Sequence, residues 1–156
     1  MTLGSYCGVY ALYRGLISLD KDVQFSDLVR AEYIGSREGS TADELVAAAD
    51  AQGVTCRVVT QMSVSALIEC PGPTILHVRS ELDTDVYKHW ILFLGVVNGQ
   101  ARICDGISPA VFITLPELAS RWDGVAILLA DSGSMLRYIH TGVPLLLGDE
   151  KVAGTD

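Results

Sequence analysis

The chain has 156 residues, a formal net charge of −8 and a sequence pI near 4.7, with 49% hydrophobic and only 19% charged residues. This length and composition fit one globular domain with its own core, and they exclude a disordered chain. An acidic chain without a Lys/Arg cluster is a poor binder of phosphate groups, so we expect no nucleic-acid partner.

The first half of the chain is predicted to be mainly helical, because its apolar residues recur three and four positions apart. The expected elements are helices over residues 7–17 and 25–34, a helix between Thr41 and Gly53, a strand over 54–59 and a short helix over 63–68. The helix after Thr41 has the clearest limits, because Thr41 and Glu44 form a capping-box pattern and Gly53 supplies a stop.

The second half is predicted to be rich in strands. The expected strands cover residues 74–78, 87–97, 100–104, 111–114 and 125–130, and a short helix covers 116–122. Asn98-Gly99 stands between two of these strands and is a strong signal for a tight antiparallel hairpin. Helices followed by an antiparallel sheet predict an α+β fold rather than a doubly wound parallel one.

Cys7 is the first candidate for chemistry, because it stands directly before an apolar helical run. Unpaired N–H groups and the helix dipole at a helix N-terminus stabilise an anion such as a thiolate. Gly8 beside it allows another backbone or a substrate to approach closely. The alternative interpretation is a small buried hydrophobe, which describes most cysteines.

His89 is the preferred candidate among the three histidines. It lies where a polar stretch passes into an apolar strand, a position at the rim of a sheet from which an imidazole can face a cleft. His77 lies inside an apolar strand and is interpreted as a core or structural histidine, and His140 lies in the C-terminal tail. The alternative for His89 is a surface histidine at a strand edge.

Asp105 closes the strand that pairs back through the Asn98-Gly99 turn. Counting outward from the turn places Asp105 opposite Leu92, with His89 three residues further along. Contact between Asp105 and His89 therefore requires a bulge or a twist. The alternative for Asp105 is an ordinary turn aspartate before a glycine. A thiol, an imidazole and a carboxylate in this chain order are the groups that a cysteine peptidase uses.

Four stretches together resemble the double-glycine leader peptidases, a papain-like family of domains on bacteriocin-exporting ABC transporters and of stand-alone relatives. The matching stretches are YCGVYAL from Tyr6, HWILFLGV from His89, ICDG from Ile103, and the segment from Leu118 to Ala126, with Gly39-Ser40-Thr41 agreeing in position. The resemblance covers residues 6–129, and its order and spacing are more specific than any single motif.

The resemblance implies a papain-like fold with N-terminal helices packed on a C-terminal antiparallel sheet. It implies that Cys7 is the nucleophile, His89 the general base and then acid, and Asp105 the group that orients the imidazole. It also implies a bacterial peptide substrate such as a leader peptide, cleaved after small residues of the Gly-Gly type, and an ABC transporter or another membrane protein as partner. No cofactor and no metal are expected.

Three positions depart from the family pattern. Met1 stands where the family has an oxyanion-hole glutamine six residues before the cysteine, Tyr6 replaces a frequent aspartate, and Gly106 replaces the usual proline. Losing one oxyanion donor costs about 100- to 1000-fold in rate. The alternatives are a sequence that starts late, or a weak or inactive relative that binds peptide for a transporter or membrane partner.

Residues 1–130 are expected to form the peptidase-like domain, and 131–156 an apolar tail that is a packed chain end, a partner contact or the stub of a longer protein. The N-terminus lacks signal-peptide features, and four scattered cysteines do not suggest a disulfide framework, so we expect a cytoplasmic setting. Association with a membrane, through a missing or an attached segment, is left open. A third interpretation is a regulatory or redox domain of a membrane protein, using the Cys7 and Cys104 thiols.

Overall fold

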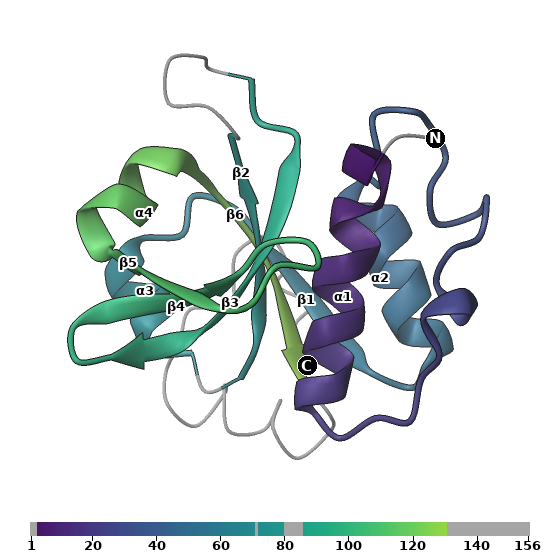
Figure 1. Ribbon diagram of the computed structural model, residues 1–156, viewed down its shortest axis with the longest axis horizontal. Coiled ribbons are helices and arrows are strands. Elements are labelled where there is room, and N and C mark those ends of the chain that lie inside the picture. The colour runs from purple at the N-terminus through teal and green to yellow at the C-terminus, as the bar shows by residue number, and fades with distance from the viewer. Residues whose placement is uncertain (1–2, 71, 80–85, 131–156) are drawn as a thin grey trace.

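The computed structural model describes residues 3–70, 72–79 and 86–130 (Figure 1). The α-helices are α1 (Cys7–Ser18), α2 (Ala42–Ala51), α3 (Val64–Ile68) and α4 (Leu115–Arg121), and short 3-10 helices cover Leu3–Tyr6 and Phe25–Asp27. The strands are β1 (Thr55–Val59), β2 (Thr74–Val78), β3 (His89–Val97), β4 (Gln100–Cys104), β5 (Val111–Thr114) and β6 (Trp122–Ala130). All the expected elements except the helix over 25–34 are therefore present, within a few residues at their ends.

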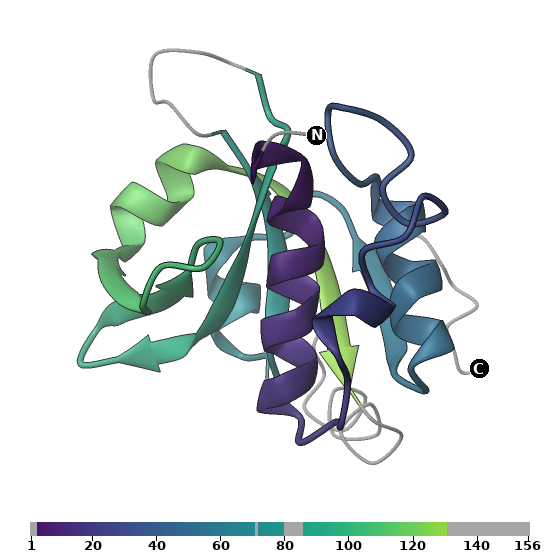
Figure 2. The ribbon, with the colours of Figure 1, turned by 45° about the vertical axis from the view of Figure 1, so that its right-hand side comes forward.

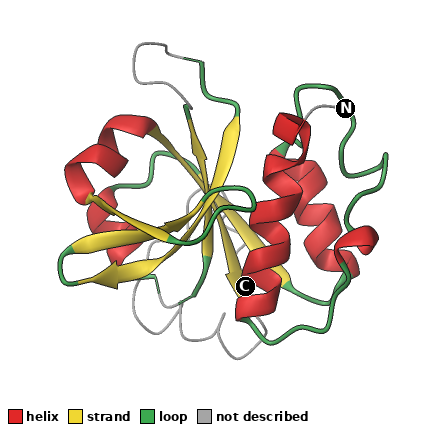
Figure 3. Cartoon of the chain, viewed as in Figure 1, coloured by secondary structure: helices red, strands yellow, loops and turns green. Residues whose placement is uncertain are grey.

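The strands form one antiparallel sheet in the order β1-β6-β2-β3-β4-β5. Figures 1 and 2 show α1 and α2 together on one side of this sheet, and Figure 3 shows the helices and strands by type. Each side has its own hydrophobic core: Leu92 belongs to the cluster beneath α1 and α2, and the next residue, Phe93, belongs to the cluster that also holds residues of α3 and α4. Successive side chains along β3 therefore point alternately into the two cores. The helices and the single antiparallel sheet confirm the α+β prediction.

Local signals explain the limits of α2. The Thr41 side chain accepts a hydrogen bond from the Glu44 N–H at 3.2 Å, and the Glu44 carboxylate accepts one from the Thr41 N–H at 2.9 Å. This capping box satisfies N–H groups that have no partner within the helix. At the other end, Gly53 has φ +78°, a conformation that favours glycine after a helix.

The prediction of a helix over residues 25–34 is wrong. Only Phe25–Asp27 forms a 3-10 helix, and turns follow, in which the N–H groups of Leu28 and Tyr33 donate to carbonyls three residues earlier. Leu28, Tyr33 and Ile34 are all buried. At about 100° per residue these side chains would point all around a helix, so one surface helix could not bury all three.

The strand register in the β3–β4 hairpin differs from the predicted one. Val97 pairs with Gln100 around the Asn98-Gly99 turn as predicted, but the register shifts between Phe93 and Val96, and Leu92 then pairs with Cys104 instead of Asp105. The shift is a β-bulge that contains Gly95 at φ +106°. Continued by one residue, the new register sets Asp105 opposite Ile91, two positions from His89, and residues two apart share one side of a strand.

None of the described helices is both long and apolar enough to cross a membrane. The expected tail over 131–156, with His140, lies outside the described residues.

Candidate active site

Cys7, His89 and Asp105 come together although they lie on three separate elements. Cys7 is the first residue of α1, His89 is the first residue of β3, and Asp105 directly follows β4. All three line one cavity of about 240 Å³, together with Tyr10 and the turn over residues 106–108. Packing of α1 across β3 therefore brings a thiol, an imidazole and a carboxylate to one place.

The His89 ring is held by Asp105. Its Nε2 donates a hydrogen bond to the Asp105 Oδ1 at 2.7 Å, and because an ionised carboxylate only accepts, the proton of this contact belongs to the ring nitrogen. Nδ1 is then the nitrogen left for Cys7. The side chain of His89 is 20% exposed and that of Asp105 is 44% exposed. Asp105 thus fixes both the orientation of the ring and the nitrogen that faces the thiol.

The electrostatics of this pair favour a charged imidazole. The hydrogen bond to Asp105, followed by one to the Cys7 side chain, raises the pKa of His89 to about 9, although burial acts in the opposite direction. The hydrogen bond from His89 in turn lowers the pKa of Asp105. His89 and Asp105 therefore form an imidazolium–carboxylate pair around neutral pH.

Cys7 is buried, with only 4% of its surface exposed, yet it lines the cavity and contacts the His89 ring. No side chain caps the N-terminus of α1, where Tyr6 is the N-cap residue. Next to Cys7, a Cβ on Gly8 would lie 3.1 Å from Trp90 Cδ1 and 3.2 Å from Leu45 Cδ1. A glycine at this position lets the first turn of α1 pack tightly against the sheet, with the thiol directed at the imidazole.

The turn after Asp105 is held to α1 by Arg14, a residue that the sequence analysis did not single out. The Arg14 guanidinium donates to the carbonyls of Gly106 at 2.8 Å and Ser108 at 2.7 Å. Arg14 lies seven residues after Cys7, two helical turns along the same face, and a lone cation in an apolar helix was the available signal. Gly106 has φ +60°, which proline cannot adopt, so the departure from the family motif has a backbone reason.

The expectation that His77 is a core histidine is wrong, although the alternative of a structural role is not. Its side chain is 21% exposed and its Nδ1 lies 2.7 Å from the Asp123 Oδ2, in a second cavity that does not include Cys7. The structural part of the interpretation stands, because this contact links β2 to β6.

The four cysteines are free thiols. Burial raises the pKa of Cys56 and of Cys70 to about 12, which leaves both protonated and weakly reactive near neutral pH. Among the residues that the structure describes, no group of three or more His, Cys, Asp or Glu is placed to hold a metal ion.

The fold matches that of known peptidase domains. A double glycine motif protease from an AMS/PCAT transporter, solved in complex with the leader peptide, is 21% identical with a TM-score of 0.66, over 85% of this chain and 87% of that one. The peptidase domain of Streptococcus ComA, a bi-functional ABC transporter involved in a quorum-sensing pathway, is 22% identical with a TM-score of 0.70, over 85% and 95%.

The N-terminal peptidase C39 like domain of the toxin secretion ATP-binding protein from Vibrio parahaemolyticus is 16% identical with a TM-score of 0.62, over 80% of this chain and 96% of that one. At these identities the likeness establishes the fold, and it confirms the expected papain-like architecture. The profile of the peptidase C39 family matches residues 4–134, so the chain belongs to the peptidase C39 family. Comparison with curated proteins gives no significant match.

Proposed function

We propose that this chain is a cysteine peptidase in which Cys7 is the nucleophile, His89 the general base and acid, and Asp105 the residue that orients His89. The observation that carries this proposal is the convergence of the three side chains on one cavity, with His89 bonded to Asp105 and in contact with Cys7. Membership of the peptidase C39 family supports the same reaction class.

In the proposed reaction the Cys7 sulfur attacks the carbonyl carbon of the scissile bond, while His89 holds the thiol proton as an imidazolium. The C–N bond then breaks, and His89 gives its proton to the leaving amine. A water molecule, deprotonated by His89, attacks the thioester and releases the acid and the free thiol. In this proposal the Cys7 backbone N–H, at the start of α1 where no side chain caps the helix, donates to the developing oxyanion.

The proposed substrate is a leader peptide cleaved after a Gly-Gly type of sequence, at the cytoplasmic side of an ABC transporter. Two structural relatives support this substrate and partner. One was solved in complex with a leader peptide, and the other is a domain of a bi-functional ABC transporter. We also propose that the domain spans about residues 1–130, in line with the family match over 4–134, and that 131–156 is an appended tail.

The second candidate function is a peptidase-like domain that binds peptide without cleaving it. The observation that favours it is Met1, at the position where the family carries its oxyanion glutamine. One fewer donor lowers the rate without preventing peptide binding.

The test is cleavage of a panel of Gly-Gly peptides, followed by mass spectrometry, with Cys7→Ala and the control Cys56→Ala. Removing a nucleophile costs at least about a thousandfold in rate, so Cys7→Ala is expected to be inactive and Cys56→Ala to resemble the wild type. Loss of cleavage in Cys7→Ala rules out the binding-only function. Peptide that binds the wild type and Cys7→Ala equally, with no cleavage by either, overturns the peptidase proposal.

A further inference from the structure

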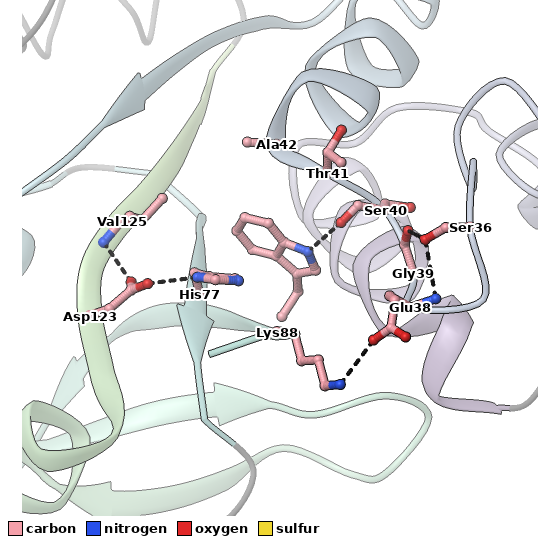
Figure 4. Close-up of a pocket in the computed structure, with 11 residues that line it drawn as sticks. Ser36, Glu38, Gly39, Ser40, Thr41, Ala42, His77, Lys88, Asp123 and Val125 are labelled. Atoms are coloured by element: carbon pink, nitrogen blue, oxygen red, sulfur yellow. Dashed lines mark hydrogen bonds and ion pairs between the residues drawn. The ribbon is translucent and has the colours of Figure 1, made fainter. Parts of the chain in front are cut away.

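A second cavity, of about 360 Å³, lies between β2, β3, β6 and the start of α2. Figure 4 shows the side chains around it, with His77 reaching in from β2, Asp123 and Val125 from β6, and Lys88 next to β3. Trp90 of β3 completes this set of walls. None of these residues takes part in the proposed reaction.

The cavity arises from an irregularity in the pairing of β2 with β6. Leu76 pairs with Ala126 and Val78 with Trp122, so His77 alone faces the three residues 123–125. The stretch of β6 opposite His77 is thus two residues longer than that of β2, and the Gly124 carbonyl accepts a hydrogen bond from the Met62 N–H at 3.0 Å. Bulges of this kind re-aim side chains near functional sites. The hollow is therefore built into the sheet.

One wall of the cavity presents a hydrogen-bond acceptor. The Asp123 carboxylate receives the Val125 N–H on Oδ1 at 3.0 Å and the His77 Nδ1–H on Oδ2 at 2.7 Å. When the ring carries a single proton, held on Nδ1 by this contact, Nε2 has a free lone pair. Figure 4 shows that nitrogen on the side of the ring away from Asp123. Within the described part of the chain, Nε2 has no hydrogen-bond partner.

The remaining surroundings favour an uncharged ligand. The Trp90 ring lies 4.5 Å from the His77 ring, centroid to centroid, and supplies a flat apolar wall. Its indole N–H is already used, because it donates to the Ser40 carbonyl at 2.9 Å. At the rim, Lys88 and Glu38 pair with each other at 2.9 Å, so neither is a free charge. Ser36, Ser40 and Thr41 also line the cavity. The flat Trp90 face beside the free His77 Nε2 suits a side chain with an apolar stem and a donor at its tip.

The cavity adjoins the candidate active site. Lys88 and Trp90 are the chain neighbours of His89, and Gly8, the neighbour of Cys7, packs against Trp90. The two cavities share no lining residue, and along β3 the side chains of Lys88 and Trp90 point to the side opposite His89. A peptide held between Cys7 and His89 therefore has to run on past the start of β3 to place a side chain in this cavity. Glycine would leave the cavity empty.

We propose that this cavity is a specificity subsite, and that it takes a glutamine-like side chain of the peptide substrate, whose N–H donates to His77 Nε2. This inference rests on the proposed peptidase function and adds a substrate requirement beyond small residues at the cleaved bond. His77 accepts the hydrogen bond from this side chain, and Asp123 acts as the positioning residue that sets the tautomer of His77.

The experiment compares cleavage of peptides that carry Gly, Met, Gln or Glu at each of three positions on either side of the cleaved bond. Met matches Gln in length but has no donor, and Glu replaces the donor by a charge. At one position the wild type is expected to prefer Gln over Met by about 2- to 10-fold in kcat/KM, the worth of one hydrogen bond. Glu and Gly are expected to be poorer still at that position.

Two variants separate the roles of the pair, and Glu32→Gln, which breaks an exposed ion pair with Arg30, is the control. His77→Phe keeps a ring but removes the acceptor, so the preference for Gln over Met disappears. In Asp123→Asn, the amide oxygen can still accept from Val125 while the amide N–H donates to His77 Nδ1. The ring proton then moves to Nε2, and the ratio of Glu to Gln cleavage is expected to rise about 10-fold or more.

Binding supplies an outcome that is independent of cleavage. In Cys7→Ala, the ¹⁵N signal of His77 Nε2 is expected to shift on addition of the Gln peptide and not of the Met peptide. That shift without any cleavage by the wild type would overturn the proposed function and support the subsite. Cleavage with equal rates for Gln and Met at every position, in the wild type and in His77→Phe, would overturn the subsite and leave the peptidase intact.

Discussion

Two imidazole–carboxylate pairs in this molecule use opposite nitrogens of the ring. His89 bonds Asp105 through Nε2 and so keeps Nδ1 for Cys7, whereas His77 bonds Asp123 through Nδ1 and keeps Nε2 for the second cavity. The same two residue types thus produce one ring that faces a thiol and one that faces an open cavity. The nitrogen left free decides what each ring can do.

The titration of His89 reports on its bond to Asp105. The folded-state pKa is raised to about 9, so the ring keeps its proton through neutral pH and loses it only as the pH rises through about 9. An NMR pH titration of the ring is expected to show that midpoint in the wild type. In Asp105→Ala, which removes the largest cause of the shift, the midpoint is expected at lower pH.

The alkaline limb of kcat/KM is expected to follow the same midpoint, because the leaving amine needs the imidazolium proton. A wild-type His89 that titrates near the ordinary value of about 6.5 would contradict the assigned pair.

At the scale of elements, the bulge in β3 is the feature that connects the fold to the site. Gly95 has φ +106°, and a Cβ built there meets no atom within 4 Å, so a side chain would strain the backbone without any steric clash. The register that follows the bulge sets Asp105 near His89. The geometry of the pair therefore depends on a backbone conformation at a residue that touches neither side chain.

We expect Gly95→Ala to destabilise the protein by about 1–3 kcal/mol, the cost of a side chain in a sparsely populated backbone region. It is also expected to reduce kcat/KM, because removing the bulge moves Asp105 away from His89. Urea denaturation and the peptide assay measure the two effects. The control is Gly99→Asn, since Gly99 also has positive φ (+78°) and asparagine tolerates that region. Equal stability and activity of both variants would refute this account of the bulge.

At the scale of the whole molecule, the position of Cys7 depends on how closely α1 seats on the sheet. A Cβ on Gly15 would lie 2.6 Å from Leu129 Cδ1 and 3.3 Å from Leu92 Cδ1. Both leucines are fully buried in the core beneath α1. The helix approaches the sheet this closely only because Gly15, like Gly8, has no side chain.

Gly15→Ala is therefore expected to destabilise the protein by about 1–2 kcal/mol in thermal or urea unfolding, since overpacking outweighs the usual gain from Gly to Ala in a helix. Ile17→Ala, on the exposed side of the same helix, is the control and should change stability little. A more stable Gly15→Ala protein would show that the core relaxes around the extra methyl group.

Much of this architecture could be predicted from local patterns. The capping box at Thr41, the Asn98-Gly99 hairpin and the start of α1 at Cys7 each depend on interactions within a few residues, and each is present as expected. The order of Cys7, His89 and Asp105 also identified the residues that line one cavity. Such local patterns predict structure well because turn and cap geometry are set mainly by neighbouring residues.

By itself, the sequence determined the secondary-structure elements with strong local signals, the α+β class and the three candidate residues. Only the tertiary structure decided that residues 28–34 form turns, that a bulge brings Asp105 to His89, and that His77 meets Asp123 across an irregular strand pair. The physical reason is that burial and strand register depend on partners far away in the chain. Local hydrogen bonding and apolar periodicity cannot report those partners until the sheet has assembled.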